Sequence, residues 1–261
     1  MSEINNLECF IDKMKSGQLA VGVVVTFTDP AVSELAADAG MDFLWIDGEH
    51  GVMDRTTAML HLMAVRGTKC ASLYRVPACN HTEIKRIIDF APAGVIIPMV
   101  LTKADAELAV AACRYPLTGN RGVGLRRQLR YGADPLTADY WEKSLHEPLV
   151  IIQIEHIDAV NNLDDILSVP GIDSLLIGPY DLSTSMGKPG QFRDPEVCNA
   201  LDTVCRKCRA AGKWLGAYTE GDYDLWRERG LHYVCAANDT GVLFNGVRAM
   251  KERCNAELKR K

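Results

Sequence analysis

The sequence alternates eight short apolar runs with segments long enough for helices, and this alternation constrains the fold more than any other feature. Two parallel strands joined through a helix need a right-handed crossover. Eight such units in about 250 residues match the size of a (β/α)8 barrel. The expected strands are Leu19–Phe27, Phe43–Ile46, Ala71–Val76, Val95–Val100, Leu149–Ile154, Ser174–Ile177, Trp214–Tyr218 and Tyr233–Ala236.

Helix-length segments separate most of these strands, and no linker or low-complexity stretch interrupts the series. We therefore predict that residues 1–261 form one α/β domain, a (β/α)8 or TIM barrel, with an open doubly wound sheet as the alternative. The long segment Tyr115–Pro148 is expected to add an extra helix. The other expected helices are Pro30–Ala39, Thr82–Phe90, Ala104–Arg114, Ala159–Leu167 and Pro195–Ala211.

The last segment, Gly241–Lys259, predicts an extended C-terminal helix with one apolar stripe. The stripe either covers the last unit of the barrel or packs on a partner subunit. Its residues are Leu243, Val247, Met250, Cys254 and Leu258.

Composition narrows the class of protein and its surroundings. A net charge of -5 argues against nucleic acid or an anionic membrane as a partner, because both favour a basic face. The sequence has no segment typical of a signal peptide or a membrane span, which predicts a cytoplasmic protein. Nine cysteines, an odd number, fit a reducing compartment. The single CxxC, Cys205 to Cys208, has no second pair, so no metal site is expected there.

Polar side chains follow several of the expected strands directly. In a barrel the substrate meets the carboxyl ends of the strands, so such residues are candidates for function. The apolar run FLWI at residues 43–46 leads into Asp47, Glu49 and His50, and a later strand ends at Arg75. Two neighbouring strands end in Gln153 and Glu155 and in Tyr180 and Asp181. We expect these groups to converge on one mouth.

Glu155 and Asp181 predict a metal site, because they follow adjacent strands. A hard divalent cation such as Mg²⁺ is often held by one or two carboxylates, while water and substrate oxygens complete its coordination. The alternative is that both are solvated loop acids. Ser183 or Thr184 is expected to cap a short helix whose free N–H groups make an anion site beside the metal.

His50 is the candidate general base, with Asp47 close enough in a tight turn to orient the imidazole. Arg75 ends an apolar strand, where a buried charge needs an anionic partner. That partner is either a substrate carboxylate or oxyanion, or a neighbouring acid.

Lysine placement argues against a Schiff-base route. Lys69 and Lys213 precede their strands and Lys188 lies in a loop, so none ends a strand at the mouth. Metal chemistry on a 2-oxo acid fits better. The run GNRGVG at residues 119–124 lacks the P-loop and dinucleotide patterns and is interpreted as a mobile loop. Its neighbourhood contains four arginines that either attract an anionic substrate or pair with surface acids: Arg121, Arg126, Arg127 and Arg130.

Several motifs together resemble the HpcH/HpaI family of metal-dependent class II pyruvate aldolases, over nearly the whole chain. They are WIDGEHG (residues 45–51), RVP (75–77), IIPMV (96–100), RGVG (121–124), QIE (153–155) and IGPYDLSTSMG (177–187). The resemblance implies cleavage of a 4-hydroxy-2-oxo acid to pyruvate and an aldehyde through a metal-stabilised pyruvate enolate. It also implies a homohexamer, a trimer of dimers that exchange C-terminal helices.

The resemblance assigns roles to residues of this chain. His50 is the acid/base residue, Arg75 steadies the enolate, and Glu155 and Asp181 bind Mg²⁺, Mn²⁺ or Co²⁺. Gln153 and the backbone at Tyr180 and Asp181 contact the substrate. Asp89 raises the basicity of the histidine, although the barrel interpretation places Asp89 at a helix end away from the mouth.

Three departures from the family pattern affect the aldehyde pocket. Tyr180 replaces a small residue, Phe90-Ala91-Pro92 replaces an Ala/Gly-rich turn, and Ala237 replaces a glycine. Two alternative functions stay open: another metal-dependent oxo-acid lyase or decarboxylase at the same site, and a non-catalytic barrel that binds a metabolite.

Overall fold

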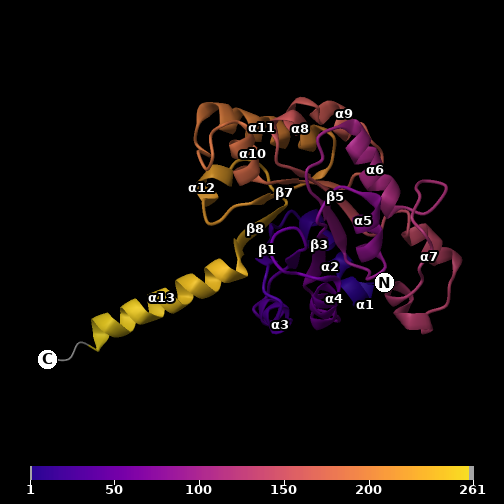
Figure 1. Ribbon diagram of the computed structural model, residues 1–261, viewed down its shortest axis with the longest axis horizontal. Helices are drawn as coiled ribbons and strands as arrows, with labels where there is room; N and C mark the ends of the chain where they lie inside the picture. Colours follow the sequence, from indigo (N-terminus) through magenta and orange to yellow (C-terminus); the bar gives the residue numbers. More distant parts are fainter. Residues whose placement is uncertain (1, 259–261) are drawn as a thin grey trace.

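The computed structural model describes residues 2–258 as a closed barrel of eight parallel strands, which confirms the predicted fold class (Figure 1). Each strand pairs with the next along the chain, and the last pairs with the first. Residues 1 and 259–261, which belong to the predicted span, lie outside the described part. The strands are β1 Ala20–Val25, β2 Phe43–Asp47, β3 Ala71–Arg75, β4 Gly94–Ile97, β5 Leu149–Ile154, β6 Ser174–Ile177, β7 Trp214–Tyr218 and β8 Tyr233–Asn238.

After α1 and α2, helices alternate with the strands along the chain. Several helices begin at a residue whose side chain accepts a hydrogen bond from a free backbone N–H group. Asn80 caps α5, and Thr102 and Asp105 form a capping box at the start of α6. The helices are α1 Ser2–Asn5, α2 Leu7–Lys15, α3 Ala31–Asp38, α4 Arg55–Ala64, α5 His81–Ile88, α6 Lys103–Cys113, α7 Ala138–Lys143, α8 Ile157–Asn161, α9 Leu163–Leu167, α10 Pro179–Ser185, α11 Pro195–Ala210, α12 Tyr223–Trp226 and α13 Asp239–Glu257, with a 3-10 turn η1 Arg127–Gly132.

The segment between β4 and β5 holds α7 and η1, so the predicted extra helix is confirmed. The expected strand Val95–Val100 was too long, because β4 ends at Ile97 and the backbone turns into the left-handed region at Met99, with φ of 52°. No described helix has the length and apolar character needed to span a membrane.

Strands β2 to β6 are buried on both faces, which is why they read as continuous apolar runs. In β2, Phe43 and Trp45 belong to the cluster that fills the barrel, whereas Leu44 and Ile46 belong to the layer between sheet and helices. Because side chains alternate along a strand, Asp47 points to the same interior side as Trp45. The apolar pattern thus delivers a carboxylate to the top of the barrel interior.

The amino ends of the strands are closed by α2. The Phe10 ring lies 5.3 Å from the Phe43 ring and 5.4 Å from the Tyr233 ring, measured between centroids. These two aromatic residues begin β2 and β8. The opposite, carboxyl ends of the strands are therefore the open side of the barrel.

Arg127 is a buried arginine whose guanidinium donates to backbone carbonyls rather than to carboxylates. Its guanidinium donates to Phe90, Ile4 and Leu62 at 2.7, 3.2 and 2.9 Å. Burial lowers its pKa to about 10. Neither predicted role, attraction of a substrate or a surface ion pair, describes this residue, which joins α1, α4 and the end of α5.

We expect Arg127→Met to lower the free energy of unfolding by about 2–4 kcal/mol, because buried carbonyls lose their donors. Urea denaturation measures this effect. The control is Arg126→Met, since Arg126 is exposed next to it and should change stability by less than about 0.5 kcal/mol. Equal stabilities of the two variants would contradict the assignment of Arg127 as a structural clamp.

Helix α13 projects away from the barrel as a single long helix (Figure 1). Asp239 at its start is buried, but the side chains from Val242 onwards are exposed. The predicted C-terminal helix is therefore present, while Lys259 of the predicted range lies outside the described residues. Five large apolar side chains of α13 are at least half exposed: Val242, Leu243, Phe244, Val247 and Met250.

Candidate active site

A cavity of about 370 Å³ opens at the carboxyl ends of the strands, and we call it the mouth. It gathers most of the residues that the sequence singled out, although they come from the ends of four different strands, β2, β3, β5 and β6. Glu155 lies directly beside it, bonded to Gln153, whereas Asp89 does not line it. The lining residues are Val24, Thr26, Trp45, Asp47, His50, Arg75, Gln153, Gly178, Pro179, Tyr180, Asp181, Tyr218 and Asn238.

Arg75 is held from two sides by carboxylates. Its Nε and Nη2 donate to the two oxygens of Asp47 at 2.9 and 2.7 Å, and its Nη1 lies 2.8 Å from Glu49 Oε2. Its guanidinium also lies 4.8 Å from the centre of the Trp45 ring. Two of its five N–H groups are thus hydrogen-bonded to Asp47, and the ion pair with Glu49 holds the other side of the guanidinium.

The charges around Arg75 decide its ionisation. Burial alone would lower the Arg75 pKa, but the hydrogen bonds and charges of Asp47 and the charge of Glu49 outweigh burial and raise it. Burial raises the pKa of Glu49, and Arg75 offsets part of this effect. The guanidinium is therefore a fixed positive charge within an acidic surround.

Gly48 allows this geometry because the chain passes very close to β3. A Cβ at this position would lie 2.1 Å from the Tyr74 hydroxyl and 2.7 Å from the Arg75 carbonyl oxygen. The Gly48 N–H donates to that same carbonyl at 2.9 Å. The glycine thus keeps Asp47 and Glu49 on either side of the arginine.

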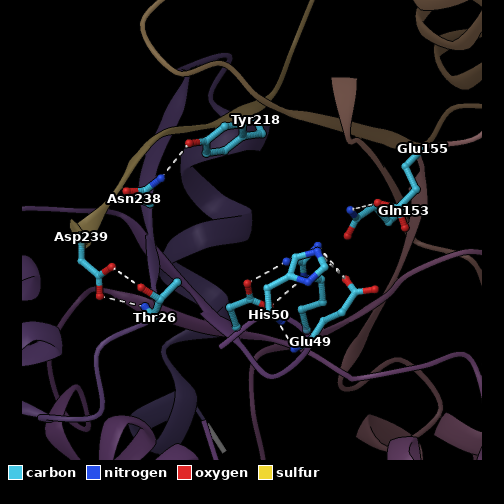
Figure 2. A network of polar contacts seen from close by, with 10 residues as sticks. Thr26, Glu49, His50, Gln153, Glu155, Tyr218, Asn238 and Asp239 are labelled. Atoms are coloured by element: carbon cyan, nitrogen blue, oxygen red, sulfur yellow. Dashed lines mark hydrogen bonds and ion pairs between the residues drawn. The ribbon is translucent and has the colours of Figure 1, made fainter. Parts of the chain in front are cut away.

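Glu155 is a buried carboxylate held by neighbours from two strands. Met99, whose backbone is in the strained left-handed region, donates its N–H to Glu155 Oε1 at 2.8 Å. The Gln153 amide donates to the other carboxylate oxygen, and this pair lies at the mouth in Figure 2. Gly178 leaves room for both, because a Cβ there would lie 3.0 Å from the Glu155 Cβ.

Burial raises the pKa of Glu155 to about 7. The Met99 N–H and the charge of Arg75 lower it, while the charges of Glu49 and Asp181 raise it. The last two effects show that these three carboxylates share one electrostatic neighbourhood. A cation would relieve the repulsion among them.

His50 lies at the rim, with its side chain 68% exposed. The acid nearest to its imidazole is Glu49, whose Oε2 is 4.0 Å from Nε2 (Figure 2). Asp47 does not orient the ring as predicted, since its Oδ1 accepts from the backbone N–H of His50 at 3.4 Å while Arg75 occupies the carboxylate. Asp47 therefore fixes the turn and Arg75 rather than the imidazole.

Asp181 lies in the first turn of α10, which begins immediately after β6. Tyr180 is partly exposed and its hydroxyl donates to Glu220, while its ring packs edge-on against Phe192. The prediction that Ser183 or Thr184 caps this helix is wrong, because both lie within it and donate to the Tyr180 carbonyl. Helix formation starts earlier than expected because Pro179 supplies its first residue.

Asp89 ends α5 and pairs with Arg121 at 3.4 Å, in agreement with the expected position away from the mouth. Burial raises its pKa, and the charge of Arg121 offsets part of that rise. Arg130 pairs with Asp134, and Arg126 lines a separate surface hollow beside Asp89. The catalytic role that the resemblance gives Asp89 is thus not supported by any contact within the described chain.

The donor set at the mouth fits a hard divalent cation. Glu155 and Asp181 supply carboxylates, and the buried Oε1 of Gln153 has no hydrogen-bond partner among the described residues. Within that part of the chain no three His, Cys, Asp or Glu residues form a complete metal cage. Two carboxylates with open positions is the arrangement expected where substrate and water complete an octahedron.

Several residues in or beside the mouth received no functional role from the sequence. Glu49 was visible in the same run as His50 but was not assigned a role. Trp45, Tyr218 and Asn238 looked like ordinary strand residues, and their place at the mouth depends on strand register. A polar residue at the end of β8 was the only available signal.

Comparison with protein families matches residues 21–243 to the family described as HpcH/HpaI aldolase/citrate lyase. The chain belongs to the HpcH/HpaI family. The resemblance inferred from the motifs is thereby confirmed. A 4-hydroxy-2-oxo-heptane-1,7-dioate aldolase of Salmonella typhi is 36% identical to this chain over 96% of it and 95% of the relative.

Two further similar proteins extend the comparison. The 5-keto-4-deoxy-D-glucarate aldolase of Escherichia coli K12 is 34% identical, covering 95% of this chain and 98% of the relative. The crystal structure of an HpcH/HpaI aldolase from Desulfitobacterium hafniense superposes with a TM-score of 0.87 at 26% identity, covering 94% of this chain and 96% of that one.

Proposed function

We propose that this protein is a divalent-metal-dependent aldolase that cleaves a 4-hydroxy-2-oxo acid into pyruvate and an aldehyde. The observation that carries the proposal is the convergence of Glu155, Asp181, Arg75 and His50 on one mouth. The aldolase names of both relatives, at 34% and 36% identity over nearly the full chain, support the same class of reaction.

In this proposal Glu155 and Asp181 hold Mg²⁺, Mn²⁺ or Co²⁺, with Gln153 beside them. The cation would act as a Lewis acid toward the carboxylate and keto oxygens of the substrate. Arg75 is already fixed by Asp47 and Glu49, so it presents its remaining N–H groups without reorganisation. It steadies the negative charge that develops on the pyruvate half.

His50 moves the proton. It takes the hydrogen of the C4 hydroxyl, directly or through a water, as the bond between C3 and C4 breaks. The electrons of that bond pass to the pyruvate half as an enolate, and the aldehyde carries away C4. Protonation at C3 then yields pyruvate. Its exposed position at the rim lets His50 exchange this proton with solvent.

The experiment that tests the proposal follows the methyl proton signal of pyruvate in D₂O, using chelated enzyme and enzyme with Mg²⁺ or Mn²⁺ restored. Exchange that requires the metal is expected, because pyruvate enolisation is the half-reaction that needs no aldehyde. Absence of exchange with every metal would overturn the proposal.

A second candidate is another lyase or decarboxylase acting on an oxo acid at the same site. The family description itself joins aldolases with citrate lyases, which favours keeping this candidate. Oxaloacetate is the discriminating substrate. Faster turnover of oxaloacetate than of any 4-hydroxy-2-oxo acid would select the second candidate.

We further propose a homohexamer in which α13 packs on a neighbouring subunit. The exposed apolar side chains of α13 support this, because a long apolar face in water is costly.

We also propose a cytoplasmic location. The nine cysteines, all free in the structure, support it, since oxidising compartments favour disulfides.

The double variant Phe244→Glu, Val247→Glu is expected to shift the protein from a hexamer to smaller species, because carboxylates cannot be buried in an apolar contact. Light scattering during gel filtration measures the mass. Lys251→Glu is the control, as Lys251 is exposed on the same helix. A monomeric wild type, or an unchanged mass of the double variant, would contradict the assembly.

A further inference from the structure

One side of the mouth carries polar groups that the proposed enolisation does not use. Strand register places Asn238 of β8 beside Val24 of β1, and Val24 beside Trp45 of β2. Tyr218 reaches the same side from β7, where its hydroxyl accepts from the Asn238 amide at 3.2 Å. Figure 2 shows Tyr218 and Asn238 across the mouth from Gln153 and Glu155. We call Trp45, Tyr218 and Asn238 the far wall.

The far wall holds two hydrogen-bond donors without an acceptor in the described chain. Trp45 is 3% exposed, and its indole N–H has no partner there. The Tyr218 hydroxyl accepts from Asn238, and none of the described residues accepts its own hydrogen. Buried donors are normally paired, so the unpaired N–H of buried Trp45 points to a ligand oxygen, and the hydroxyl of the partly buried Tyr218 is a second donor beside it. Both side chains line the mouth.

The charge of the mouth limits what that ligand can be. Arg75 is the only lysine or arginine among its lining residues, and it already contacts the carboxylates of Asp47 and Glu49. A second anionic group on the ligand would therefore meet neutral donors and nearby carboxylates. Glu220, bonded to the Tyr180 hydroxyl, adds another acid at the rim. This surround disfavours an aldehyde that carries its own carboxylate.

We infer that the far wall binds the aldehyde half of the substrate and that this aldehyde is an uncharged hydroxyaldehyde. Its hydroxyl oxygens accept from the Trp45 N–H and the Tyr218 O–H, while its carbonyl carbon faces the pyruvate half held near Glu155 and Asp181. The inference rests on the proposed aldolase function and adds the class of aldehyde. A site built to bond a hydroxyl rejects analogues that lack it.

The test is the aldol reaction of pyruvate with three aldehydes, catalysed by the metal-loaded enzyme: glyceraldehyde, butanal and succinic semialdehyde. For the wild type, kcat/KM for glyceraldehyde is expected to exceed the other two by about 10-fold or more. Trp45→Phe keeps a ring under Arg75 but removes the N–H, and Tyr218→Phe removes the O–H. Each variant should lower kcat/KM for glyceraldehyde about 10-fold. It should change kcat/KM for butanal by less than about 2-fold, because butanal has no hydroxyl to lose a hydrogen bond.

Two control variants distinguish the loss of a far-wall hydrogen bond from a general loss of activity. Trp141→Phe and Tyr223→Phe make the same chemical changes outside the mouth. Both should leave kcat/KM for all three aldehydes unchanged. Pyruvate exchange in D₂O is measured for every variant, so that aldol turnover can be expressed relative to enolisation.

Two results would overturn the inference alone. One is a higher kcat/KM of the wild type for succinic semialdehyde than for glyceraldehyde. The other is an equal loss of kcat/KM for all three aldehydes in the far-wall variants while pyruvate exchange continues. Loss of exchange in the metal-loaded wild type would overturn the proposed function and this inference together. The exchange measurement therefore tells the two failures apart.

Discussion

Asp181→Ala is expected to abolish the metal-dependent exchange of pyruvate methyl protons. In the proposed metal site Asp181 and Glu155 hold the cation together, so removal of Asp181 leaves Glu155 as the one proposed carboxylate ligand. Outer-shell partners of metal ligands typically contribute 10- to 100-fold to affinity or activity, so loss of a ligand should cost more than about 100-fold. The loss should appear both in the exchange rate and in Mn²⁺ affinity measured by electron paramagnetic resonance.

The matched control is Asp158→Ala. Asp158 is an exposed acid that follows β5, as Glu155 does, but it does not line the mouth. The Asp158→Ala variant should bind Mn²⁺ with wild-type affinity and exchange pyruvate protons at the wild-type rate. Wild-type Mn²⁺ affinity in Asp181→Ala would show that the carboxylate is a solvated acid, which is the alternative that the sequence left open.

His50→Ala should reduce aldol cleavage by about 10² to 10⁴, because this is the usual contribution of a general base. Metal binding should persist, since the imidazole lies at the rim and contacts neither Glu155 nor Gln153 in the structure. The comparison of cleavage rate with Mn²⁺ affinity therefore distinguishes a lost base from a damaged metal site.

His146→Ala serves as the control, because His146 lies in a surface hollow formed by the segment between β4 and β5. It should leave cleavage unchanged. Turnover of His50→Ala within about 2-fold of the wild type would mean that another group takes the C4 proton. Glu49, the acid nearest to the imidazole, would then be the first residue to replace.

The sequence predicted those parts of the protein that depend on local pattern. Eight apolar runs were enough for the barrel, because strands buried on both faces leave a clear signal. The same argument placed Arg75, Gln153 and Asp181 at strand ends, and hence at one mouth. These inferences needed only the alternation of elements and the rule that parallel strands end on the same side.

The parts that were missed depend on distances between strands. Asp47 and His50 are three residues apart, which suggested a carboxylate–imidazole pair, but the nearer guanidinium of Arg75 takes the carboxylate. Trp45 and Tyr218 meet the mouth only because of how β1, β2, β7 and β8 align. The direction of α13 could not be derived either, since an apolar stripe does not specify which surface it covers.

The closure of the barrel has a consequence for biosynthesis. Asp239 accepts hydrogen bonds from the backbone N–H groups of Thr26 and Phe27 at 2.8 Å, across more than 200 positions of sequence. At about 5–20 residues per second, a ribosome needs roughly 10–40 s to make the chain between them. During that interval the edge of β1 that faces β8 has no strand to pair with, while its other edge can pair with β2. The nascent barrel is thus an open sheet until β8 is made, and its closure depends on the last strand of the chain.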